Sequence, residues 1–199
     1  MKTDQSIIIH ESSIIDTDVK IGNGTRIWHF CHVMSNVQIG KECILGHNVF
    51  IGPDVKIGNI VKIQNNVSIY SGVIIEDRVF IGPSVTFTNV INPRSFINRK
   101  NDFRTTLIKV GATLGANSTI LCGVVIGMFA LIGAGSVVTH DVPGYALVYG
   151  NPARLHGWIC ECGHKLQFSG KEEIKNYSCQ NCQKNYIKQE LCVSLVNNR

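Results

Sequence analysis

The sequence contains no long apolar run, and this absence excludes a helix that spans a membrane. The first ten residues, MKTDQSIIIH, have too short an apolar stretch for a secretory signal peptide, so we expect a cytoplasmic protein without a membrane partner. The excess of one charge sign is small, because 19 Lys and Arg stand against 14 Asp and Glu and give a formal net charge of +5. This excess is too diffuse to indicate a nucleic acid partner, although it suits small polyanionic ligands.

A helical period is also absent from most of the chain. From Ile9 to Phe87 every sixth residue is apolar, and the residue four places later is mostly Val or another small residue. A period of six fits neither an α-helix nor an alternating strand, and it is typical of a parallel β-helix built from hexapeptide repeats. We therefore predict an all-β protein in which three hexapeptides form one triangular coil. The apolar residues at this period are Ile9, Ile15, Ile21, Ile27, Val33, Ile39, Leu45, Ile51, Ile57, Ile63, Ile69, Ile75, Ile81 and Phe87.

The repeat is interrupted once, between about residues 88 and 106, and it resumes in a new phase from Ile108 to Val138. The interruption has no period and contains Pro93 and several basic residues, so we expect it to leave the coil as a functional loop. About twenty hexapeptides remain, which predicts six to seven coils. The Pro and Gly residues of segment 141–155 are expected to end the repeat.

Residues eighteen positions apart share one side of successive coils. One column is therefore expected to contain His29, His47, Asn65 and Pro83, and its neighbour Phe30, Asn48, Asn66 and Ser84. Tyr70 is expected one coil below Thr88, where the loop begins. Larger residues replace the usual Gly in several of these hexapeptides, so we predict that His29, Asn65, Asn66 and Tyr70 belong to a substrate-binding surface. The structural alternative is that Asn occupies such turns because it tolerates positive φ.

A triangular coil filled with Ile and Val has no internal pocket, and its outer faces are flat. A concave binding site then requires the loop, a second copy of the chain, or both. We therefore predict a homotrimer with parallel coil axes, whose sites lie between neighbouring subunits.

The segment GATLGANSTILCGVVIGMFALIGAGSVVTHDVPGYALVYGNPARL resembles the acetyl-CoA-binding region of the left-handed β-helix hexapeptide acyltransferases. TRIWHFCHV, IQNNVSIY, FIGPSVTFTNVINPRS and KVGATLGAN further resemble the nucleotide-sugar 3-N-acetyltransferases of the WlbB/WbpD type. The resemblance covers about residues 10 to 157. It implies a left-handed coil, acetyl-CoA as co-substrate, and a UDP-linked 2-acetamido-3-amino uronic acid as acceptor, for surface polysaccharide synthesis. A dTDP-3-amino-6-deoxyhexose is the alternative acceptor.

The same resemblance implies which residues contact acetyl-CoA: Ala116, Ala134, Thr139, His140 and Arg154. Small residues let the pantetheine arm approach the backbone, and Arg154 is expected to pair with phosphate. His140 stands where relatives often have Lys, so its phosphate contact would be weaker and dependent on pH. The structural alternative is that the small residues occupy ordinary interior or turn positions.

One departure from the family bears on mechanism. O-acetyltransferases of this fold have a His-Pro pair in the loop, and Asn92-Pro93 stands there in this chain. An oxygen nucleophile would need that His as general base, whereas a sugar amine already has a usable lone pair. We therefore expect direct attack by an amine. Asn89 is expected to orient the amine or to donate to the oxyanion, with a backbone N–H such as that of Gly111 helping to stabilise it. His29 and His47 are alternative bases, or surface residues with structural contacts only.

The acceptor is expected to contain a diphosphate and a carboxylate. The family comparison places Asn92 in its binding site, and we expect Arg26, Arg94 and Arg99 to pair with the anionic groups because guanidinium geometry suits both. The alternative role for these arginines is in solvated or inter-subunit salt bridges.

The eight cysteines fall into two groups. Cys31 and Cys43 occupy the small interior position of their hexapeptides, and Cys122 and Cys192 are left unassigned. The pairs CEC and CQNC, with sixteen residues between them, predict a four-cysteine zinc ribbon, although the first is C-x-C and not the commoner C-x-x-C. Its ligands would be Cys160, Cys162, Cys179 and Cys182; His164 as a substitute ligand, a disulfide and free thiols are the alternatives. We thus divide the chain into a β-helix acyltransferase domain, residues 1–157, and a ribbon-like domain, residues 158–199.

Two other functions fit less well. A γ-class carbonic anhydrase shares the triangular coil but needs three converging His ligands, and only His29 and His47 share a column here. A scaffold with a nucleic-acid-binding ribbon would need a basic stripe, and the C-terminal segment interleaves Lys with Glu.

Overall fold

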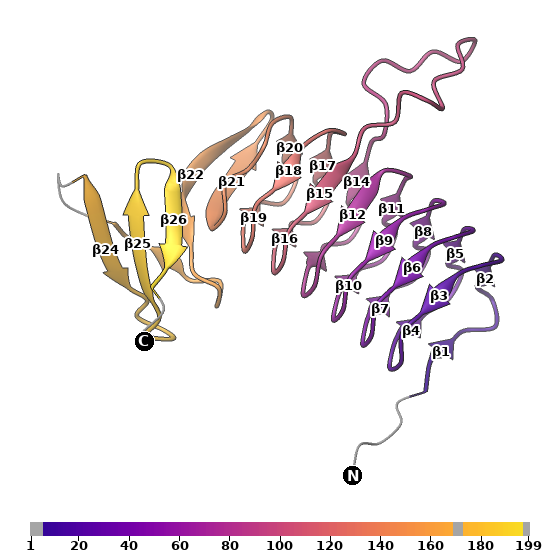
Figure 1. Cartoon of the computed structure of the whole chain (residues 1–199), viewed down its shortest axis with the longest axis horizontal. Helices are drawn as coiled ribbons and strands as arrows, with labels where there is room; N and C mark the ends of the chain where they lie inside the picture. The colour runs from indigo at the N-terminus through magenta and orange to yellow at the C-terminus, as the bar shows by residue number, and fades with distance from the viewer. Residues whose placement is uncertain (1–5, 169–172, 197–199) are drawn as a thin grey trace.

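The computed structural model describes residues 6–168 and 173–196, and these residues form strands, turns and loops without a helix. Within these two ranges there is accordingly no helix that could cross a membrane. Figure 1 shows a stack of similar coils with a long loop rising from it and a separate small sheet at the C-terminal end. We call the stack of coils the prism, and its three parallel sheets A, B and C.

The three sheets of the prism each contain one short strand from each of the first six coils, and neighbouring strands pair in parallel. Sheet A contains β1 (Ile8–Ile9), β4 (Arg26–Ile27), β7 (Ile44–Leu45), β10 (Lys62–Ile63), β13 (Phe80–Ile81), β16 (Thr113–Leu114), β19 (Leu131–Ile132) and β21 (Ala146–Gly150). Sheet B contains β2 (Ile14–Ile15), β5 (His32–Val33), β8 (Phe50–Ile51), β11 (Ser68–Ile69), β14 (Thr86–Phe87), β17 (Thr119–Ile120) and β20 (Val137–Val138). Sheet C contains β3 (Lys20–Ile21), β6 (Gln38–Ile39), β9 (Lys56–Ile57), β12 (Val73–Ile75), β15 (Thr106–Ile108) and β18 (Val125–Ile126).

The predicted period of six is confirmed in both phases of the repeat. Each apolar residue at that period ends a strand, and Ile27 pairs with Leu45, eighteen residues further along. From Ile27 onward these residues fill the core, and each is at most 4% exposed. Cys31 and Cys43 are likewise buried in the small interior position, and burial raises the pKa of both thiols.

The prism is longer than predicted, because segment 141–155 continues the coil before it leaves it. Val142 forms a bridge to Ile126, and Leu147 then pairs with Leu131 in sheet A. The added strand β21 gives sheet A eight coil strands, so the prism has about eight turns and not six to seven. Pro143 and Gly144 end the period of six, but they do not prevent parallel pairing on either side.

The corners of the prism are formed by residues with positive φ. Between sheets A and B, Phe30 (φ 57), Asn48 (56), Asn66 (60) and Ser84 (59) stack in one column, as predicted from the spacing of eighteen. Asn66 therefore has at least a backbone role, because an Asn accepts this conformation more readily than most residues.

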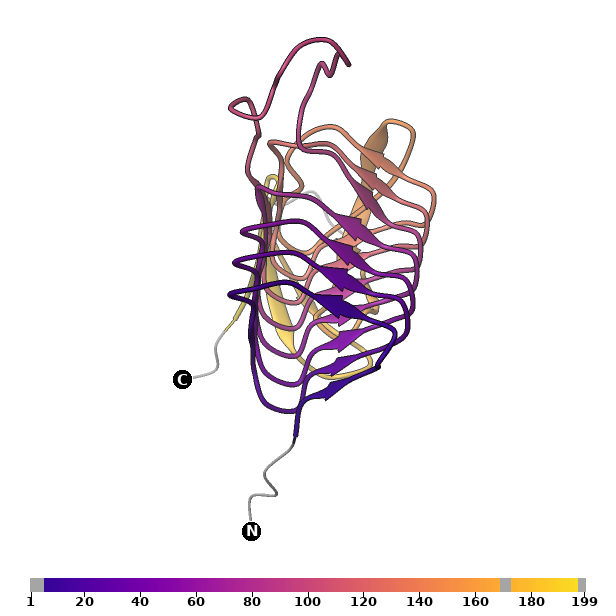
Figure 2. The ribbon, with the colours of Figure 1, turned by 90° about the vertical axis from the view of Figure 1, so that its right-hand side faces the viewer.

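The interrupting segment leaves the prism between sheets B and C as a long loop (Figures 1 and 2). Its two ends lie together, because the Arg104 N–H donates to the Asn89 carbonyl at 3.0 Å. Beyond this pair the chain exposes large apolar side chains, among them Phe96 at 83% and Ile91 at 53%. The expected extruded loop is thus present, with an apolar surface that a single chain does not cover.

The C-terminal segment first extends sheet A and then forms a sheet of its own. Strand β22 (Ala153–Ile159) folds back antiparallel to β21, and β23 (Lys165–Leu166) pairs with β22. The separate C-terminal sheet contains β24 (Ile174–Ser178), β25 (Asn185–Gln189) and β26 (Cys192–Leu195). Strand β22 runs through the expected boundary at residue 157, so sheet A itself continues into the second unit.

Candidate active site

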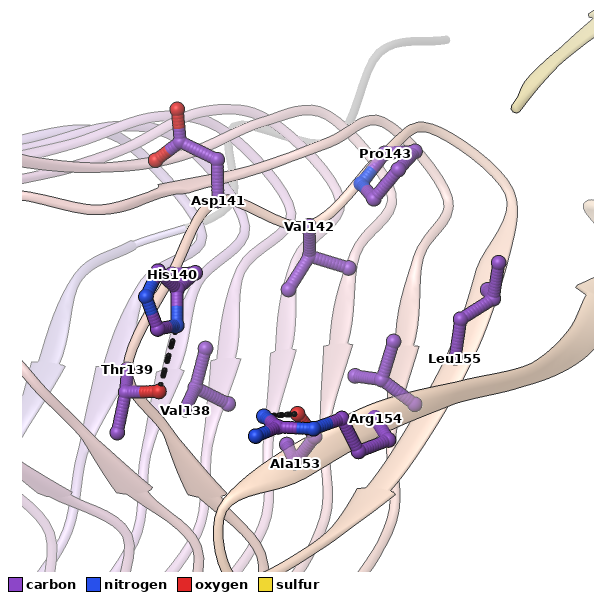
Figure 3. A pocket seen from close by; sticks show the side chains of 10 residues that line it. Val138, Thr139, His140, Asp141, Val142, Pro143, Ala153, Arg154 and Leu155 are labelled. Atoms are coloured by element: carbon purple, nitrogen blue, oxygen red, sulfur yellow. Dashed lines mark hydrogen bonds between the residues drawn. The ribbon is translucent and has the colours of Figure 1, made fainter. Parts of the chain in front are cut away.

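A cavity of about 230 Å³ lies at the C-terminal end of the prism. Its walls come from the end of β20, the following segment 139–143, and the hairpin of β21 and β22. In Figure 3 the Arg154 side chain extends from β22 towards the side of the cavity where Thr139 and His140 lie. The hairpin is thus the element that converts the flat outer surface of the prism into a concave site.

The cavity combines an apolar floor with cationic and polar groups. Val142, Pro143 and Val148 supply apolar surface, and Arg154 is exposed with one guanidinium nitrogen, Nη1, donating to the Ala153 carbonyl at 3.1 Å. Thr139 Oγ1 and His140 Nδ1 lie 2.8 Å apart. The remaining guanidinium N–H groups suit an anionic ligand such as phosphate.

Three of the five predicted coenzyme residues, Thr139, His140 and Arg154, therefore line one cavity. The other two, Ala116 and Ala134, lie at the corner between sheets A and B. There the Gly135 N–H donates to the Ala116 carbonyl at 2.8 Å, which stacks the two turns on each other. The sequence analysis did not predict the apolar walls of the cavity, which are Val142, Pro143, Val148 and Leu155. The available signal was the Pro and Gly pattern of segment 141–155, because such a pattern is typical of a hairpin as well as of the end of a repeat.

Among the predicted substrate-binding residues, His29, Asn65 and Asn66 lie together at the corner between sheets A and B. The His29 ring stacks on His10 with centroids 3.5 Å apart. Asn65 Oδ1 accepts the His47 N–H at 2.8 Å, and Asn66 Oδ1 accepts a hydrogen from Asn48 Nδ2 at 3.1 Å. Both amides thus connect successive coils, and they remain exposed at the surface.

Tyr70 and Asn89 lie at the next corner, between sheets B and C. The register Ser68↔Thr86 places Tyr70 one coil below Thr88, as predicted, and its ring centroid is 5.7 Å from that of Phe50. Asn89 is half-buried where the loop begins, and its carbonyl closes the loop. The outer surface of sheet B therefore separates the Asn65 corner from the Asn89 corner.

The loop itself holds Asn92, Arg94 and Arg99, and it has internal contacts. Arg94 Nη1 donates to the Pro93 carbonyl at 3.0 Å, and Arg99 pairs with Asp102 at 3.1 Å. Arg26 lies on the outer surface of sheet A. The structure therefore distributes the predicted acceptor residues over two corners, a loop and a neighbouring face, and one chain alone does not bring them into one cavity.

The N–H of Gly111, the predicted oxyanion donor, donates to the Asp77 carbonyl at 3.0 Å. It lies at the corner between sheets C and A, whereas Asn89 lies at the corner between sheets B and C. One chain alone therefore does not bring the Gly111 amide beside Asn89, and that amide already has a partner within the prism. The position also requires glycine, because its φ is +69 and a Cβ there would lie 2.3 Å from the Phe129 ring of the next coil. The absent side chain leaves room for that ring.

Replacing Gly111 with Ala is expected to lower the free energy of unfolding more than replacing Gly135 with Ala. Both glycines have φ +69, so each variant incurs a similar backbone cost of roughly 1–2 kcal/mol. Only residue 111 adds a clash, because a Cβ at residue 135 meets nothing within 4 Å. Urea unfolding of both variants measures the difference, and equal losses would show that the Phe129 ring moves aside at no cost.

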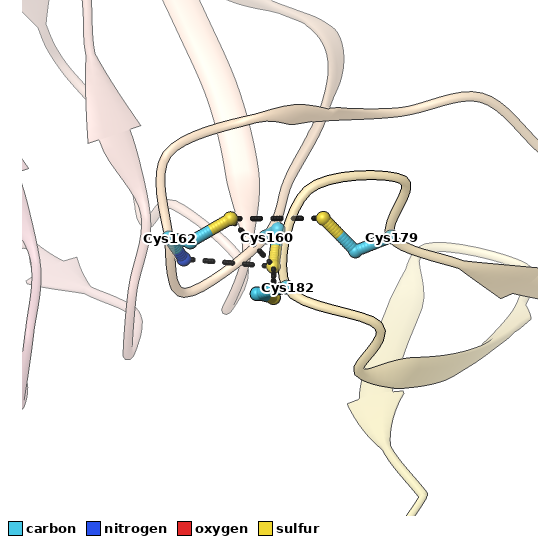
Figure 4. A group of neighbouring side chains, drawn as sticks. All are labelled: Cys160, Cys162, Cys179 and Cys182. Atoms are coloured by element: carbon cyan, nitrogen blue, oxygen red, sulfur yellow. Dashed lines mark hydrogen bonds between the residues drawn. The ribbon is translucent and has the colours of Figure 1, made fainter.

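A second group of side chains lies between the prism and the C-terminal sheet. The ligand atoms of Cys160, Cys162, Cys179 and Cys182 all lie within 4.8 Å of one another (Figure 4). The shortest contacts join Cys160 to Cys182 at 3.3 Å, Cys160 to Cys162 at 3.4 Å, and Cys162 to Cys179 at 3.6 Å. Zn–S bonds of about 2.3 Å in a tetrahedron place sulfur atoms roughly 3.8 Å apart, so the four thiols fit one zinc ion after a small adjustment.

Hydrogen-bond donors surround these sulfur atoms. Burial raises the pKa of the Tyr186 hydroxyl, which stays protonated and lies 3.0 Å from Cys160 Sγ. Asn181 Nδ2 donates to Cys162 Sγ at 3.5 Å. Burial raises the pKa of the Cys160 thiol. Desolvation also opposes ionisation of Cys162, but hydrogen bonds from the His164 backbone and from Asn181 outweigh this effect. The pKa of the Cys162 thiol is therefore lowered. Such donors orient and stabilise thiolates that bind a metal.

Comparison with known proteins gives matches over the repeats and over nearly the whole chain. The family model described as bacterial transferase hexapeptide (six repeats) matches residues 18–53 and 54–89, and the model for the hexapeptide repeat of succinyl-transferase matches residues 36–71 and 110–140. A curated protein of Aneurinibacillus thermoaerophilus, dTDP-3-amino-3,6-dideoxy-alpha-D-galactopyranose 3-N-acetyltransferase, is 56% identical over 182 residues. That alignment covers 92% of this chain and 91% of the relative.

Solved structures share the fold at lower identity. PerB of Caulobacter crescentus, solved with CoA and GDP-perosamine, matches with a TM-score of 0.51 and 21% identity, over 77% of this chain and 58% of that one. A mutant of AntD, an N-acyltransferase of Bacillus cereus solved with dTDP and coenzyme A, matches with a TM-score of 0.52 and 20% identity, over 77% and 83%. From the repeat, the prism and the relative that matches it end to end, we conclude that the chain belongs to the hexapeptide-repeat acyltransferase family and is an enzyme of that family.

Proposed function

We propose that the protein transfers acetyl from acetyl-CoA to the 3-amino group of a dTDP-linked 3-amino-3,6-dideoxyhexose. The proposal rests on one observation, the 56% identity to the Aneurinibacillus enzyme across 92% of the chain. The sequence motifs led us to expect a UDP-linked amino uronic acid first and a dTDP-amino-deoxyhexose as the alternative. The relative supports the alternative better than the first expectation.

The proposed active site is shared between subunits of a homotrimer with left-handed coils. Two features support this proposal: the acceptor residues lie on separate corners of one chain, and the loop exposes Phe96 and Ile91. Against a neighbouring prism, the loop residues Asn92, Arg94 and Arg99 would face a sheet B surface flanked by His29, Asn65, Asn66 and Tyr70. The acceptor diphosphate would lie near the arginines, and Arg26 would contact its outer end.

The proposed reaction needs no general base of the enzyme. The unprotonated sugar amine attacks the thioester carbonyl, and a tetrahedral oxyanion forms with a new C–N bond. The C–S bond then breaks, coenzyme A leaves as a thiolate, and the nitrogen loses a proton, which gives an amide and the free thiol. Asn89 orients the amine or donates to the oxyanion, and correct placement supplies most of the acceleration.

In this proposal acetyl-CoA binds along the C-terminal coils. Its phosphates lie near Arg154, Thr139 and His140 in the cavity, and its pantetheine arm passes the small residues Ala116 and Ala134. Replacing Arg154 with Ala is expected to raise KM for acetyl-CoA by about 10- to 150-fold with little change in kcat, because a charge-assisted hydrogen bond contributes about 1.5–3 kcal/mol. Lys56→Ala, on the exposed surface of sheet C, is the matched control. Steady-state kinetics measure both, and an unchanged KM in the Arg154 variant would contradict the assignment.

We also propose that the four thiolates hold one structural zinc ion and that residues 158–199 form a ribbon-like unit around it. A closed set of four thiolates leaves no open position for catalysis. Metal analysis of protein purified without added metal tests this proposal, with one zinc per chain as the expected result.

The choice of acceptor is tested directly by thiol release from acetyl-CoA. The assay compares dTDP-3-amino-3,6-dideoxyhexoses, a UDP-linked 2-acetamido-3-amino uronic acid, and matched sugars with a hydroxyl at C3. We expect the dTDP-amino sugar to have the highest kcat/KM and the hydroxyl sugars to show no turnover. A preference for the UDP-linked uronic acid would restore the first expectation, and turnover of hydroxyl sugars would overturn the mechanism.

A further inference from the structure

The two halves of the four-cysteine cluster come from different sheets. Cys160 and Cys162 follow β22 and precede β23, both strands of sheet A. Cys179 and Cys182 lie in the turn between β24 and β25 of the C-terminal sheet. Within residues 6–168 and 173–196, no strand pairing joins these two sheets. A metal bound by all four cysteines would therefore join the prism to the C-terminal sheet.

A row of aromatic rings lies along this junction. Tyr186 of β25 is fully buried, and its ring centroid is 5.5 Å from that of Tyr145, which stacks on Phe129 at 5.5 Å. Phe129 in turn covers Gly111, at the corner between sheets C and A. The Tyr186 hydroxyl also accepts the Glu161 N–H at 3.1 Å. Tyr186 thus contacts both the prism and the cysteine cluster.

Charged side chains make two contacts at the rim of the junction. Lys184 pairs with Glu161, and Lys188 Nζ lies 5.9 Å from the centre of the Trp158 ring. A cavity of about 450 Å³, lined by Arg78, Phe129, Cys182 and Lys184, separates parts of the two surfaces. The Lys184 side chain is 46% exposed, and an ion pair open to solvent on one side contributes little to stability. The attachment therefore depends mainly on the buried rings and on the cysteine cluster beside them.

We propose that zinc binding is what holds the C-terminal sheet against the prism, so that loss of zinc releases β24–β26 while the coils stay folded. This inference rests on the proposed zinc site, and it adds a role for the ion. Four thiolates from two sheets can share an ion only when the sheets are docked, so ion binding and docking are coupled. The coils need no such help, since each one pairs with the coils above and below it.

The test uses full-length protein and two readouts, zinc content and hydrogen exchange followed by mass spectrometry. Wild-type protein should contain one zinc per chain. Removing it with a chelator, or replacing Cys179 with Ser, should speed exchange in residues 174–196 at least tenfold. Exchange in residues 26–87 should not change.

The matched control is Cys192→Ser, because Cys192 is an exposed thiol outside the cluster. This variant should keep both its zinc and the wild-type exchange pattern. Re-adding zinc to the chelated protein should restore slow exchange, which separates release of the sheet from misfolding.

The possible results distinguish a failure of the proposed zinc site from a failure of the proposed docking role of zinc. A protein that binds no zinc would overturn the zinc site, and with it this inference. A protein that binds zinc but shows unchanged exchange in residues 174–196 after zinc removal would overturn the inference and leave the zinc site intact. Faster exchange throughout the coils would also overturn it, because zinc would then support the whole fold. Acetyl transfer measured on the same samples tests the proposed reaction separately and decides neither question.

Discussion

Replacing Asn89 with Ala is expected to lower kcat/KM for the amino sugar by about 10²–10³-fold, the range typical for losing one donor to a developing oxyanion. Asn89 is half-buried at the root of the loop, where its backbone is held by the Arg104 N–H at 3.0 Å. That bond involves only the main chain, so truncating the side chain leaves the loop closed. The loss is therefore expected in catalysis and not in folding.

Steady-state kinetics and thermal unfolding of the same preparation separate the two effects. Asn101→Ala is the matched control, because Asn101 is an exposed amide in the same loop, and it should retain wild-type kinetics. A fall in kcat without a rise in KM would indicate a contact made in the transition state. Wild-type kcat/KM in the Asn89 variant would show that the amine needs no help from this residue. The search for an oxyanion donor would then move to other groups near the loop, since the Gly111 amide is already bonded.

Replacing residues 90–103 with a Gly-Gly dipeptide is expected to reduce kcat/KM by 10³-fold or more, on the order expected when reacting groups lose their placement. The prism should still fold, because the excised residues lie beyond the pair formed by Asn89 and Arg104. Just after that pair, Thr106 pairs with Val73 in sheet C, so the coil closes without the loop. The shortened chain also loses the exposed Phe96 and Ile91, which we propose contact a neighbouring subunit.

The measurements are kcat/KM, far-ultraviolet circular dichroism, and molar mass in solution by light scattering. Phe96→Ala is the control within an intact loop, since it removes one exposed ring and leaves Asn89, Asn92, Arg94 and Arg99 in place. Its kcat/KM should fall much less than that of the shortened chain. Nearly full activity of a loop-less enzyme would contradict the shared site, and an unchanged molar mass with lost activity would limit the loop to substrate binding.

The strands of the prism could be predicted almost residue by residue. Strand ends such as Ile27, Leu45 and Ile63 fall on the predicted period, because each hexapeptide makes one strand and one turn and then repeats the same environment. The column of Phe30, Asn48, Asn66 and Ser84 followed from the same spacing. The four cysteines were also grouped correctly, since closely spaced pairs on two hairpins bring their sulfur atoms together.

The errors arose where a residue's surroundings come from another coil. The Phe129 ring of the next coil, which explains why no side chain fits at Gly111, was not predicted. Segment 141–155 was taken as the end of the repeat, yet its pairing with β19 depends on an edge that only the finished coil provides. The apolar walls of the cavity around Arg154 were likewise missed, because they come from segment 139–143 and from a hairpin that folds back over it.

The amino-acid sequence by itself determined the prism, its corners and the point at which the loop leaves it, because a strict repeat makes every coil the template for the next. Only the tertiary structure decided which residues meet between non-repeating parts: the hairpin over the cavity, and the rings and thiols between the prism and the C-terminal sheet. Those contacts have no period, and they depend on side chains from distant segments arriving at the same place.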